Sequence, residues 1–412
     1  MTLTDEVKQK VSLVMNKNRV SGCIEGKNFY YTQPSKKTYP SQFFWDSAFH
    51  SIINIDLGDP EWAVKELSTL FSIQRDDGFI GHQIYWTGKR LLDGLITRYY
   101  KKCGCRQSPV QSCVVQPPVI GHAIHRLWHA GRKKDAEKLA KNAVLFLKWL
   151  EDNRADHDGL IRIIHPWESG MDALPCYDKV LGIGRLKTGG YMRKLVELLK
   201  YYNELEWDQK LLSSSGLFRV KDVGYNAITS EAYFLLSQVT GDRDLAEKGA
   251  KILDSIEKYM WDSKSELFYS LGPGGEMLNV KTVASLLPLI LDISSDKVEA
   301  LNAHILNKNE FWAHFPLPSV SMDEPQFNPK PSSLLLWRGP TWIATNWFVV
   351  RGLLKHNCRK IAEMIVKRNA ALIRVHGLRE QYNPITGAPG GAKDFGWSGL
   401  VLDMLYMLGE VI

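Results

Sequence analysis

Several classes of protein are excluded by what this 412-residue sequence lacks. No window approaches the eighteen or so consecutive apolar residues of a membrane-spanning helix, since even the mostly apolar run 283–291 contains Ser285 and Pro288. The N-terminus does not have the basic and then apolar order of a signal peptide. We therefore expect neither a membrane span nor secretion.

Cysteine is also scarce. Six cysteines form no dense disulfide framework, which is typical of a protein from a reducing cytoplasm. Cys103, Cys105 and Cys113 lie close in sequence, but a Cys-x-Cys pair with a third cysteine eight positions later does not match the common spacings of zinc sites. We predict a cytoplasmic protein with no metal site, and the role of these three cysteines stays open.

Charge of one sign is not in large excess. The sequence has 52 Lys and Arg against 45 Asp and Glu, and the net charge of +7 is spread along the chain. Charged residues make up 24% and hydrophobic residues 44%, which are values of a globular protein and not of a disordered nucleic-acid-binding arm. We expect no nucleic-acid partner, and the pattern does not reveal the oligomeric state.

Helical periodicity dominates what is present. Residues 61–74, 136–151 and 244–259 repeat apolar side chains at spacings near 3.6, and a helix-like segment directly precedes each range. A glycine and then a polar or capping residue join the two segments, which is typical of antiparallel helix hairpins. Roughly twelve helices fit the chain, and convincing alternating strands are nearly absent. No linker divides the chain, so we predict one all-α domain over residues 1–412.

Long loops rich in aromatic residues, glycine and proline separate the hairpins. Loops of this length on a rigid helical scaffold are usually functional, so we expect the chemistry to lie in them. They cover residues 29–49, 78–118, 165–184, 316–340 and 382–397.

The segment of residues 39–50 carries aromatic, amide and carboxylate side chains together. Trp45 offers an apolar ring face on which a sugar can stack, and Gln42 and Asp46 offer polar groups for paired hydroxyls. The alternative is a helix entrance with Asp46 as the N-cap and the aromatic rings in the core. This segment alone does not decide between the two interpretations.

Three carboxylates lie in the loop of residues 165–178. Asp172 is the best candidate for a general acid, because an apolar ring such as that of Trp167 favours the neutral form of a nearby carboxyl. The alternative is that Asp172, Glu168 and Asp178 only cap helices and close turns.

The segment of residues 337–347 brings tryptophans and an arginine together. Pro340 suits the first turn of a helix, so we expect the residues before it to lie in the loop above that helix. The alternative is a buried structural arginine among core tryptophans. In the functional interpretation, one cavity is lined by Trp337, Arg338, Trp342 and Asn346.

A glycine-rich turn follows Glu380 in residues 379–398. We expect Glu380 to end a helix, and the glycines after it let the backbone approach a ligand closely, which would place Glu380 as a base. Taken alone, the segment is also compatible with an ordinary helix–loop–helix.

Together the four segments resemble the catalytic segments of one family, glycoside hydrolase family 63. The resemblance runs over residues 39–405, nearly the whole chain, and the motifs stand in the family's order. Related six-hairpin sugar hydrolases, including trehalases, share only parts of the set. The motifs are Gln-x-x-Trp-Asp-Ser-x-Phe, Glu-Ser-Gly-Met-Asp, Trp-Arg-Gly-Pro-x-Trp with a downstream Asn, Glu-x-Tyr-Asn-Pro-x-Thr-Gly, and Phe-x-Trp-Ser.

The resemblance implies a single (α/α)6 barrel and an inverting α-glycosidase that acts on a small carbohydrate without a cofactor. It implies that Asp172 is the general acid and that Glu380 is the general base that activates water. Inversion then requires the two carboxyls to lie roughly 6.5–9.5 Å apart. With the residues above, the substrate-binding candidates are Tyr39, Gln42, Trp45, Asp46, Tyr85, Gln116, Trp167, Gly170, Trp337, Arg338, Trp342, Asn346 and Trp397.

The compact length narrows the expected subgroup. Processing α-glucosidases of the family carry an extra β-rich N-terminal domain, whereas here the first motif begins by Tyr39. The compact form resembles the mannosylglycerate and glucosylglycerate hydrolases, which implies a small α-mannoside or α-glucoside as the substrate. We predict that residues 78–118 form a lid or aglycone loop, in which Arg90, Arg98 or Arg106 either meets a carboxylate or only solvates the loop.

Other interpretations remain open. One keeps the barrel and changes the chemistry, as in a trehalase-like glucosidase, an epimerase or an unsaturated-uronide hydrolase. Another is a non-catalytic carbohydrate-binding scaffold, which would keep the tryptophans and could dispense with Asp172 and Glu380. The presence of both carboxyls favours the enzyme.

Overall fold

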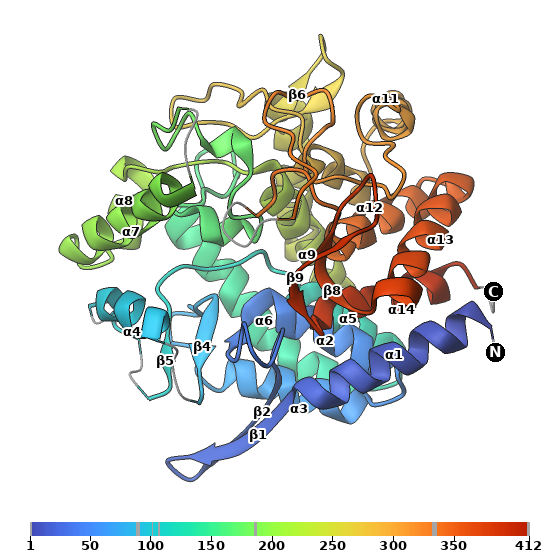
Figure 1. Cartoon of the computed structure of the whole chain (residues 1–412). Coiled ribbons are helices and arrows are strands. Elements are labelled where there is room, and N and C mark those ends of the chain that lie inside the picture. The colour runs from blue at the N-terminus through green and yellow to red at the C-terminus, as the bar shows by residue number, and fades with distance from the viewer. Residues whose placement is uncertain are drawn as a thin grey trace.

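Six helices form a closed ring in the computed structural model, which describes residues 2–87, 91–100, 102–105, 108–184, 188–331 and 336–409. Each helix contacts the next, and the last contacts the first (Figure 1). The ring consists of α2 (Phe44–Asp56), α5 (Ile120–His129), α9 (Val223–Thr240), the 3-10 helix η5 (Val283–Ile290), α12 (Ile343–Lys355) and α14 (Leu400–Met407).

A second layer of helices covers the outside of the ring. Five of them follow an inner helix along the chain and pack on it, and the N-terminal helix covers α14. This arrangement is the predicted (α/α)6 barrel. The outer helices are α1 (Leu3–Asn18), α3 (Pro60–Phe71), α6 (Lys133–Arg154), α10 (Arg243–Ser255), α11 (Ser295–Leu306) and α13 (Arg359–His376).

Further helices lie in the connections between the hairpins. The α-helices among them are α4 (Leu91–Thr97), α7 (Thr188–Glu204) and α8 (Gln209–Ser215). The single turns are η1 (Arg98–Tyr100), η2 (Pro166–Ser169), η3 (Pro175–Tyr177), the π-turn η4 (Ile256–Met260) and η6 (Gly396–Gly399).

The three helices expected from periodicity are confirmed as α3, α6 and α10. Asp59 caps α3 by accepting a hydrogen bond from the backbone N–H of Trp62 at 3.1 Å. The joint before each helix contains a glycine in the left-handed region, with φ of 85° at Gly58, 82° at Gly131 and 74° at Gly241. These glycines let the chain reverse without the steric cost of a side chain.

Two local predictions are wrong. Pro340 does not begin a helix, because Thr341 pairs with Tyr382 through backbone hydrogen bonds and stays extended, and α12 begins only at Ile343. Glu380 does not end a helix either. Helix α13 stops at His376, and Glu380 lies in strand β8 (Arg379–Tyr382), which pairs with β9 (Pro389–Lys393).

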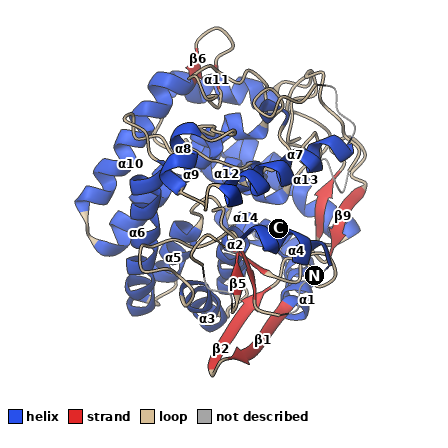
Figure 2. Cartoon of the chain, turned by 90° about the vertical axis from the view of Figure 1, so that its left-hand side faces the viewer, coloured by secondary structure: helices blue, strands red, loops and turns tan. Residues whose placement is uncertain are grey.

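Short strands are more numerous than the sequence predicts. The hairpin of β1 (Arg19–Ile24) and β2 (Lys27–Thr32) projects from the helices (Figure 2). Glu25 and Gly26 at its turn both have positive φ, 52° and 75°, as tight hairpins require. The remaining strands are β3 (Gln42–Phe43), β4 (Gln83–Tyr85) and β5 (Val110–Gln111) in one sheet, and the pair β6 (Trp261–Asp262) and β7 (Leu267–Phe268).

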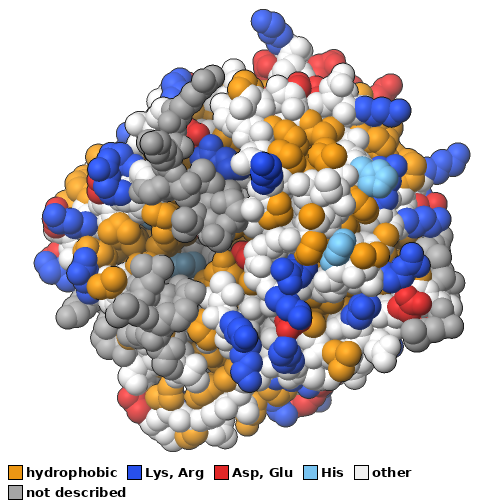
Figure 3. Space-filling model, in the orientation of Figure 1, with side chains coloured by type: hydrophobic (Ala, Val, Ile, Leu, Met, Phe, Trp, Pro, Cys, Tyr) orange, Lys and Arg blue, Asp and Glu red, His pale blue; other side chains and the backbone are white. Residues whose placement is uncertain are grey.

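The structure has the apolar core and the mixed charged surface that the globular composition predicts. The buried apolar side chains form one continuous cluster that runs through the ring. Lys and Arg are scattered among acidic and apolar side chains on the face shown in Figure 3.

No helix in the described ranges is long and apolar enough to cross a membrane. Cys103 and Cys113 form a disulfide bond, and the other four cysteines do not.

Candidate active site

A cavity of about 420 Å³ opens at the end of the ring where the inner helices begin. It is built by the loops before these helices, so segments far apart in the sequence meet there. All four predicted segments contribute to its wall. The lining residues are Pro34, Tyr39, Phe43, Trp45, Asp46, Gln116, Gly170, Asp172, Leu336, Trp337, Trp342, Glu380, Phe395 and Trp397.

Asp172 is the carboxylate of the 165–178 loop that faces this cavity. The surrounding protein withdraws its carboxyl from water, and this raises the pKa of Asp172 well above its usual value. The carboxyls of Glu380 and Asp46 lie close enough to raise it further by charge repulsion. Burial thus favours the protonated form of Asp172.

The other two carboxylates of the loop have structural partners. Glu168 is fully buried, pairs with Arg154 at 2.9 Å and accepts a hydrogen bond from the backbone N–H of Ile164 at 2.7 Å. Asp178 binds the guanidinium of Arg338 through two hydrogen bonds of 2.6 and 2.7 Å. Asp172 alone of the three lines the cavity.

Glu380 stands in the same cavity but in a different environment. Its Oε1 accepts a hydrogen bond from the Tyr39 hydroxyl at 2.9 Å, and its Oε2 accepts one from the backbone N–H of Ala392 at 2.7 Å. Burial raises the pKa of Glu380, and both hydrogen bonds oppose that rise because they stabilise the carboxylate. The carboxylate is thus fixed in one orientation by Tyr39 and strand β9.

Gly391 makes this arrangement of Glu380 possible. It has φ of 62°, and a Cβ atom at this position would lie 2.4 Å from the Glu380 Oε2 atom. A side chain there would therefore be strained and would displace the carboxylate.

Unpaired polar atoms line the inner end of the cavity. The carboxylate of Asp46 is in the first turn of α2, and burial raises the pKa of Asp46 to about 7, although the nearby His50 opposes the rise. Its Oδ1 atom has no hydrogen-bond partner among the described residues, and neither has the indole N–H of Trp342 or of Trp397. A bound molecule with several hydroxyls would satisfy these groups, which are costly to leave buried and unpaired.

Aromatic rings form the apolar walls. Trp337 and Trp342 are stacked, with ring centroids 3.8 Å apart and planes 8° apart. Trp397 meets the ring of Trp45 edge-on at 5.2 Å. Gly170 has φ of 73° and a Cβ there would lie 2.4 Å from the Trp45 ring, so only glycine lets this ring take its place.

Gln116 fixes the entrance of α2. Its side-chain oxygen accepts a hydrogen bond from the backbone N–H of Trp45 at 3.1 Å. Gln116 also lines the cavity, so it connects the loop before α5 with Trp45 and Asp46 in the first turn of α2.

Five of the predicted substrate-binding residues are not in the cavity wall. Two of them have structural hydrogen bonds in the interior. Gln42 accepts a hydrogen bond from the indole of Trp86 at 2.6 Å, and Asn346 accepts one from the backbone N–H of Leu317 at 3.1 Å. Both side chains are fully buried. They support the loops that carry the site and do not line it.

The other three lie close to the site. The Tyr85 hydroxyl donates to Gln83 at 2.8 Å, the Trp167 ring packs on His165 at 4.6 Å, and Arg338 is paired with Asp178. In the predicted lid, Arg98 is exposed and donates to the hydroxyl of its neighbour Tyr99. Arg90 and Arg106 lie outside the described residues.

Sequence reasoning missed some of the residues that shape the cavity. Pro34 comes from a loop that carries no recognised motif, and it reaches the site because its carbonyl accepts a hydrogen bond from the backbone N–H of Gly396 at 2.8 Å. Phe43 and Phe395 lie inside the recognised segments, and Leu336 lies directly before the segment 337–347, but none of the three was predicted to contact a ligand. Their position beside the motifs was the available signal.

Comparisons with known proteins agree with this geometry. The family model described as the mannosylglycerate hydrolase MGH1-like glycoside hydrolase domain matches residues 39–398. The chain is 30% identical to the mannosylglycerate hydrolase of Thermus thermophilus, over 89% of this chain and 94% of that protein. It is 26% identical to the glucosylglycerate hydrolase of Mycolicibacterium hassiacum, over 89% of this chain and 92% of that protein.

Solved structures show the same fold. The crystal structure of the family 63 mannosylglycerate hydrolase from Thermus thermophilus in complex with Tris has a TM-score of 0.85 at 28% identity and covers 97% of this chain and 100% of that chain. A neutral trehalase from Saccharomyces cerevisiae shares the fold at a TM-score of 0.62 and 14% identity, covering 97% of this chain and 80% of that chain. The family match spans most of the chain, and the chain belongs to the mannosylglycerate hydrolase MGH1-like family of glycoside hydrolases, within family 63, whose enzymes are inverting α-glycosidases.

Proposed function

We propose that this enzyme hydrolyses a small α-mannoside or α-glucoside whose aglycone is glycerate, with Asp172 as the general acid and Glu380 as the general base. One observation carries the assignment of the two roles. Both carboxyls face one cavity, yet the protein around Asp172 favours its protonated form, whereas two hydrogen bonds to Glu380 favour its carboxylate.

The reaction follows from these two environments. Asp172 gives its proton to the glycosidic oxygen as the bond from that oxygen to the anomeric carbon breaks. Glu380 takes a proton from a water molecule, whose oxygen bonds to the opposite face of the anomeric carbon. The products are the free sugar with inverted configuration and the released aglycone alcohol. No cofactor takes part in this scheme, and the predicted carboxyl separation of roughly 6.5–9.5 Å remains a prediction of it.

The cavity wall supports a sugar ring as the bound group. The unpaired Asp46 Oδ1 accepts a hydrogen bond from a sugar hydroxyl, and the indole N–H groups of Trp342 and Trp397 donate to hydroxyl oxygens. The ring of Trp337 or Trp45 stacks against the C–H face of the sugar.

Glycerate as the aglycone is supported by the relatives. Mannosylglycerate and glucosylglycerate hydrolases are among the relatives that align with nearly the whole chain. We propose that residues 78–118 face the aglycone, since β4 of this stretch pairs with β3, which lies just before Trp45 and Asp46, and β5 pairs with β4. On this view residues 1–412 act as one catalytic domain.

Proton NMR of the first product tests the reaction. With an α-linked substrate, the β-anomer of the free sugar should appear first and then mutarotate. First release of the α-anomer would contradict inversion. A panel of α-mannosides and α-glucosides, each with glycerate, glycerol or methanol as the aglycone, tests the substrate. A preference for glycerate supports the aglycone proposal, and equal rates with all three aglycones would refute it.

Two substitutions test the roles of the carboxyls. Asp172→Asn and Glu380→Gln should each lower kcat by about 10²–10⁴-fold, because each removes one proton transfer. Both variants should keep the fold, measured by circular dichroism and thermal unfolding. Asp152→Asn, a change of an exposed carboxylate on α6, is the control and should leave kcat unchanged. A Glu380→Gln variant with normal kcat would remove Glu380 from the mechanism.

The predicted cytoplasmic location also stays a proposal. It rests on the small number of cysteines. The Cys103–Cys113 disulfide is the feature that calls for a direct test of this location. Cell fractionation with alkylation of thiols at the time of lysis should find the enzyme in the cytoplasmic fraction. Recovery from an exported fraction would overturn this proposal.

A further inference from the structure

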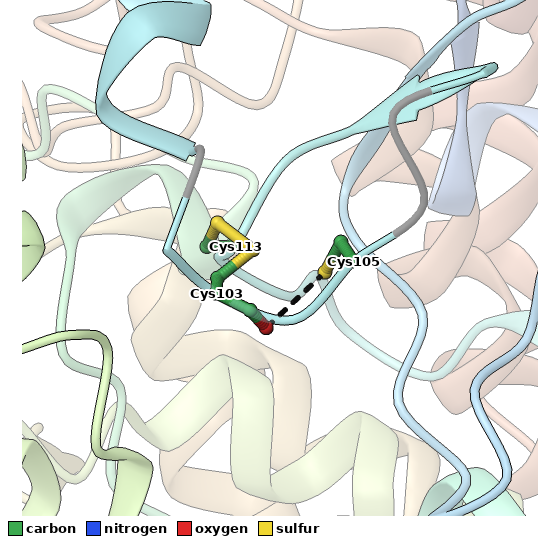
Figure 4. Close-up of side chains that lie close together, drawn as sticks. All are labelled: Cys103, Cys105 and Cys113. Carbon is green, nitrogen blue, oxygen red and sulfur yellow. Dashed lines mark hydrogen bonds between the residues drawn. A yellow bond between two sulfur atoms is a disulfide. The ribbon is translucent and has the colours of Figure 1, made fainter.

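Three cysteines that the proposed reaction does not use converge beside the β3–β4–β5 sheet. Cys103 and Cys113 form the disulfide bond, and the thiol of Cys105 lies next to them (Figure 4). The three sulfur atoms all lie within 4.8 Å of one another, and all three residues are buried. The spacing in the sequence did not predict a common site, but the fold brings the sulfurs together.

We propose that, once the Cys103–Cys113 bond is reduced, these three cysteines bind one soft, thiophilic divalent cation such as Zn²⁺, with an exogenous ligand in the fourth position. A zinc–sulfur bond is about 2.3 Å long, so two sulfurs on one tetrahedral ion lie about 3.8 Å apart. The existing cluster is already on this scale, and binding requires only that Cys103 and Cys113 separate while Cys105 stays near. This inference is independent of the proposed function.

Local structure holds the cluster in place. Gly104, between Cys103 and Cys105, has φ of 67°, which turns the backbone so that both side chains lie on the side of Cys113 (Figure 4). Arg75 donates a hydrogen bond to the carbonyl of Cys103 at 2.7 Å. These contacts reduce the conformational freedom that the ligands would lose on binding a metal.

The charges near the cluster suit three thiolates on a divalent ion. Such a complex carries a net charge of about −1 in its buried position, and the guanidinium of Arg75 lies close enough to Cys105 to offset it. A coordinated cation removes the proton of each thiol, because metal ligation deprotonates a thiol outright.

The oxidised and metal-bound states exclude each other. The disulfide occupies two of the three sulfurs, so an ion can enter only after reduction. Reduction changes no other bond: two electrons from an added thiol or phosphine reductant convert the Cys103–Cys113 disulfide into two thiols, with uptake of two protons. In this scheme the metal replaces the disulfide as the cross-link between the segment after η1 and the segment after strand β5.

Titration of the untagged, full-length enzyme with Co²⁺ and then Zn²⁺ tests the proposal. The protein is first reduced with a phosphine under anaerobic conditions and freed of metal. We expect one Co²⁺ per chain with a thiolate-to-metal charge-transfer absorption, and stoichiometric displacement by Zn²⁺. Oxidised enzyme, with the disulfide confirmed by mass spectrometry, should give no such absorption.

Cysteine variants identify the site. Cys105→Ser and Cys113→Ser should each weaken Co²⁺ binding by at least tenfold, whereas Cys23→Ser, which changes an exposed cysteine in β1, should have no effect. Cys105→Ala repeats the test, and circular dichroism and thermal unfolding show that each variant is folded. Absence of binding to the reduced wild-type enzyme, or binding unchanged in both Cys105 variants, would overturn the proposal.

Discussion

Three acidic side chains share one cavity, and the atoms around each determine what it can do. Burial raises the pKa of all three, but hydrogen bonds from Tyr39 and Ala392 oppose that rise at Glu380, and Asp46 keeps one oxygen unpaired. Carboxyl groups in one cavity therefore suit different roles because their hydrogen-bond partners differ.

The hydroxyl of Tyr39 gives a prediction for the pH profile. Tyr39→Phe removes a hydrogen bond that stabilises the Glu380 carboxylate, so the pKa of Glu380 should rise. The base is then protonated at a higher pH, and the acidic limb of the kcat/KM profile should move to higher pH while the basic limb stays. The profile is measured with the same glycerate-linked glycoside on the wild type and on Tyr39→Phe.

The control for this prediction is another tyrosine that loses one hydrogen bond. The Tyr233 hydroxyl donates to the carbonyl of Leu147 at 3.3 Å within the helical layers. Tyr233→Phe should alter stability slightly and leave both limbs in place. If the acidic limb moves equally in both variants, Tyr39 does not tune Glu380.

Elements of secondary structure position these residues, and the sequence predicts some elements better than others. The hairpins that contain α3, α6 and α10 were predictable because periodicity and glycine joints are local signals. Strand β8 was not, because its pairing with β9 and the bridge from Thr341 to Tyr382 depend on distant segments. Glu380 was consequently assigned to the correct cavity and to the wrong element.

The β8–β9 hairpin gives a prediction with a matched control. Gly391→Ala puts a methyl group 2.4 Å from the Glu380 Oε2 atom, so the carboxylate must move and kcat should fall by about 10²-fold or more. Gly377→Ala, also at a positive φ, of 70°, with nothing within 4 Å of the added Cβ, imposes backbone strain without that collision. The steady-state kcat and the melting temperature are compared for both variants.

Only the first variant should lose activity, while both should lose roughly 1–2 kcal/mol of stability. Equal losses of kcat in Gly377→Ala and Gly391→Ala would show that strain in the backbone, and not the position of Glu380, governs the rate.

At the scale of the whole molecule, closure of the helical ring brings Asp46, Asp172 and Glu380 into one cavity. Loops that precede α2, α5, α12 and α14 meet at one end, although they span more than 350 positions of sequence from Tyr39 to Trp397. Burying three carboxyls together opposes folding at a pH where they must ionise. The catalytic arrangement is thus maintained at a cost in stability.

Asp46→Asn measures that cost. The folded-state pKa of Asp46 is raised to about 7 from 3.8, so the folded protein binds its proton more tightly than the unfolded chain. The stability from this group is complete below about pH 4 and is lost as the pH rises to about 7. The loss in the free energy of unfolding over this pH range is about 4 kcal/mol at most.

The variant should therefore be more stable than the wild type at about pH 8, and the difference should shrink towards zero near pH 4. Chemical denaturation at both pH values measures the free energy of unfolding. A wild type that is the more stable of the two at the higher pH would contradict the assigned direction.

The sequence by itself determined the helix hairpins, the family motifs and the residues Asp172, Glu380, Trp45 and Trp342 as candidates. These depend on local periodicity, capping and residue type. Tertiary structure alone decided that Glu168 and Asp178 are held by arginines, that Gln42 and Asn346 support loops, and that three cysteine sulfurs meet. The physical reason is that burial, charge pairing and long-range backbone contacts are set by segments that are distant in the chain and adjacent only after it folds.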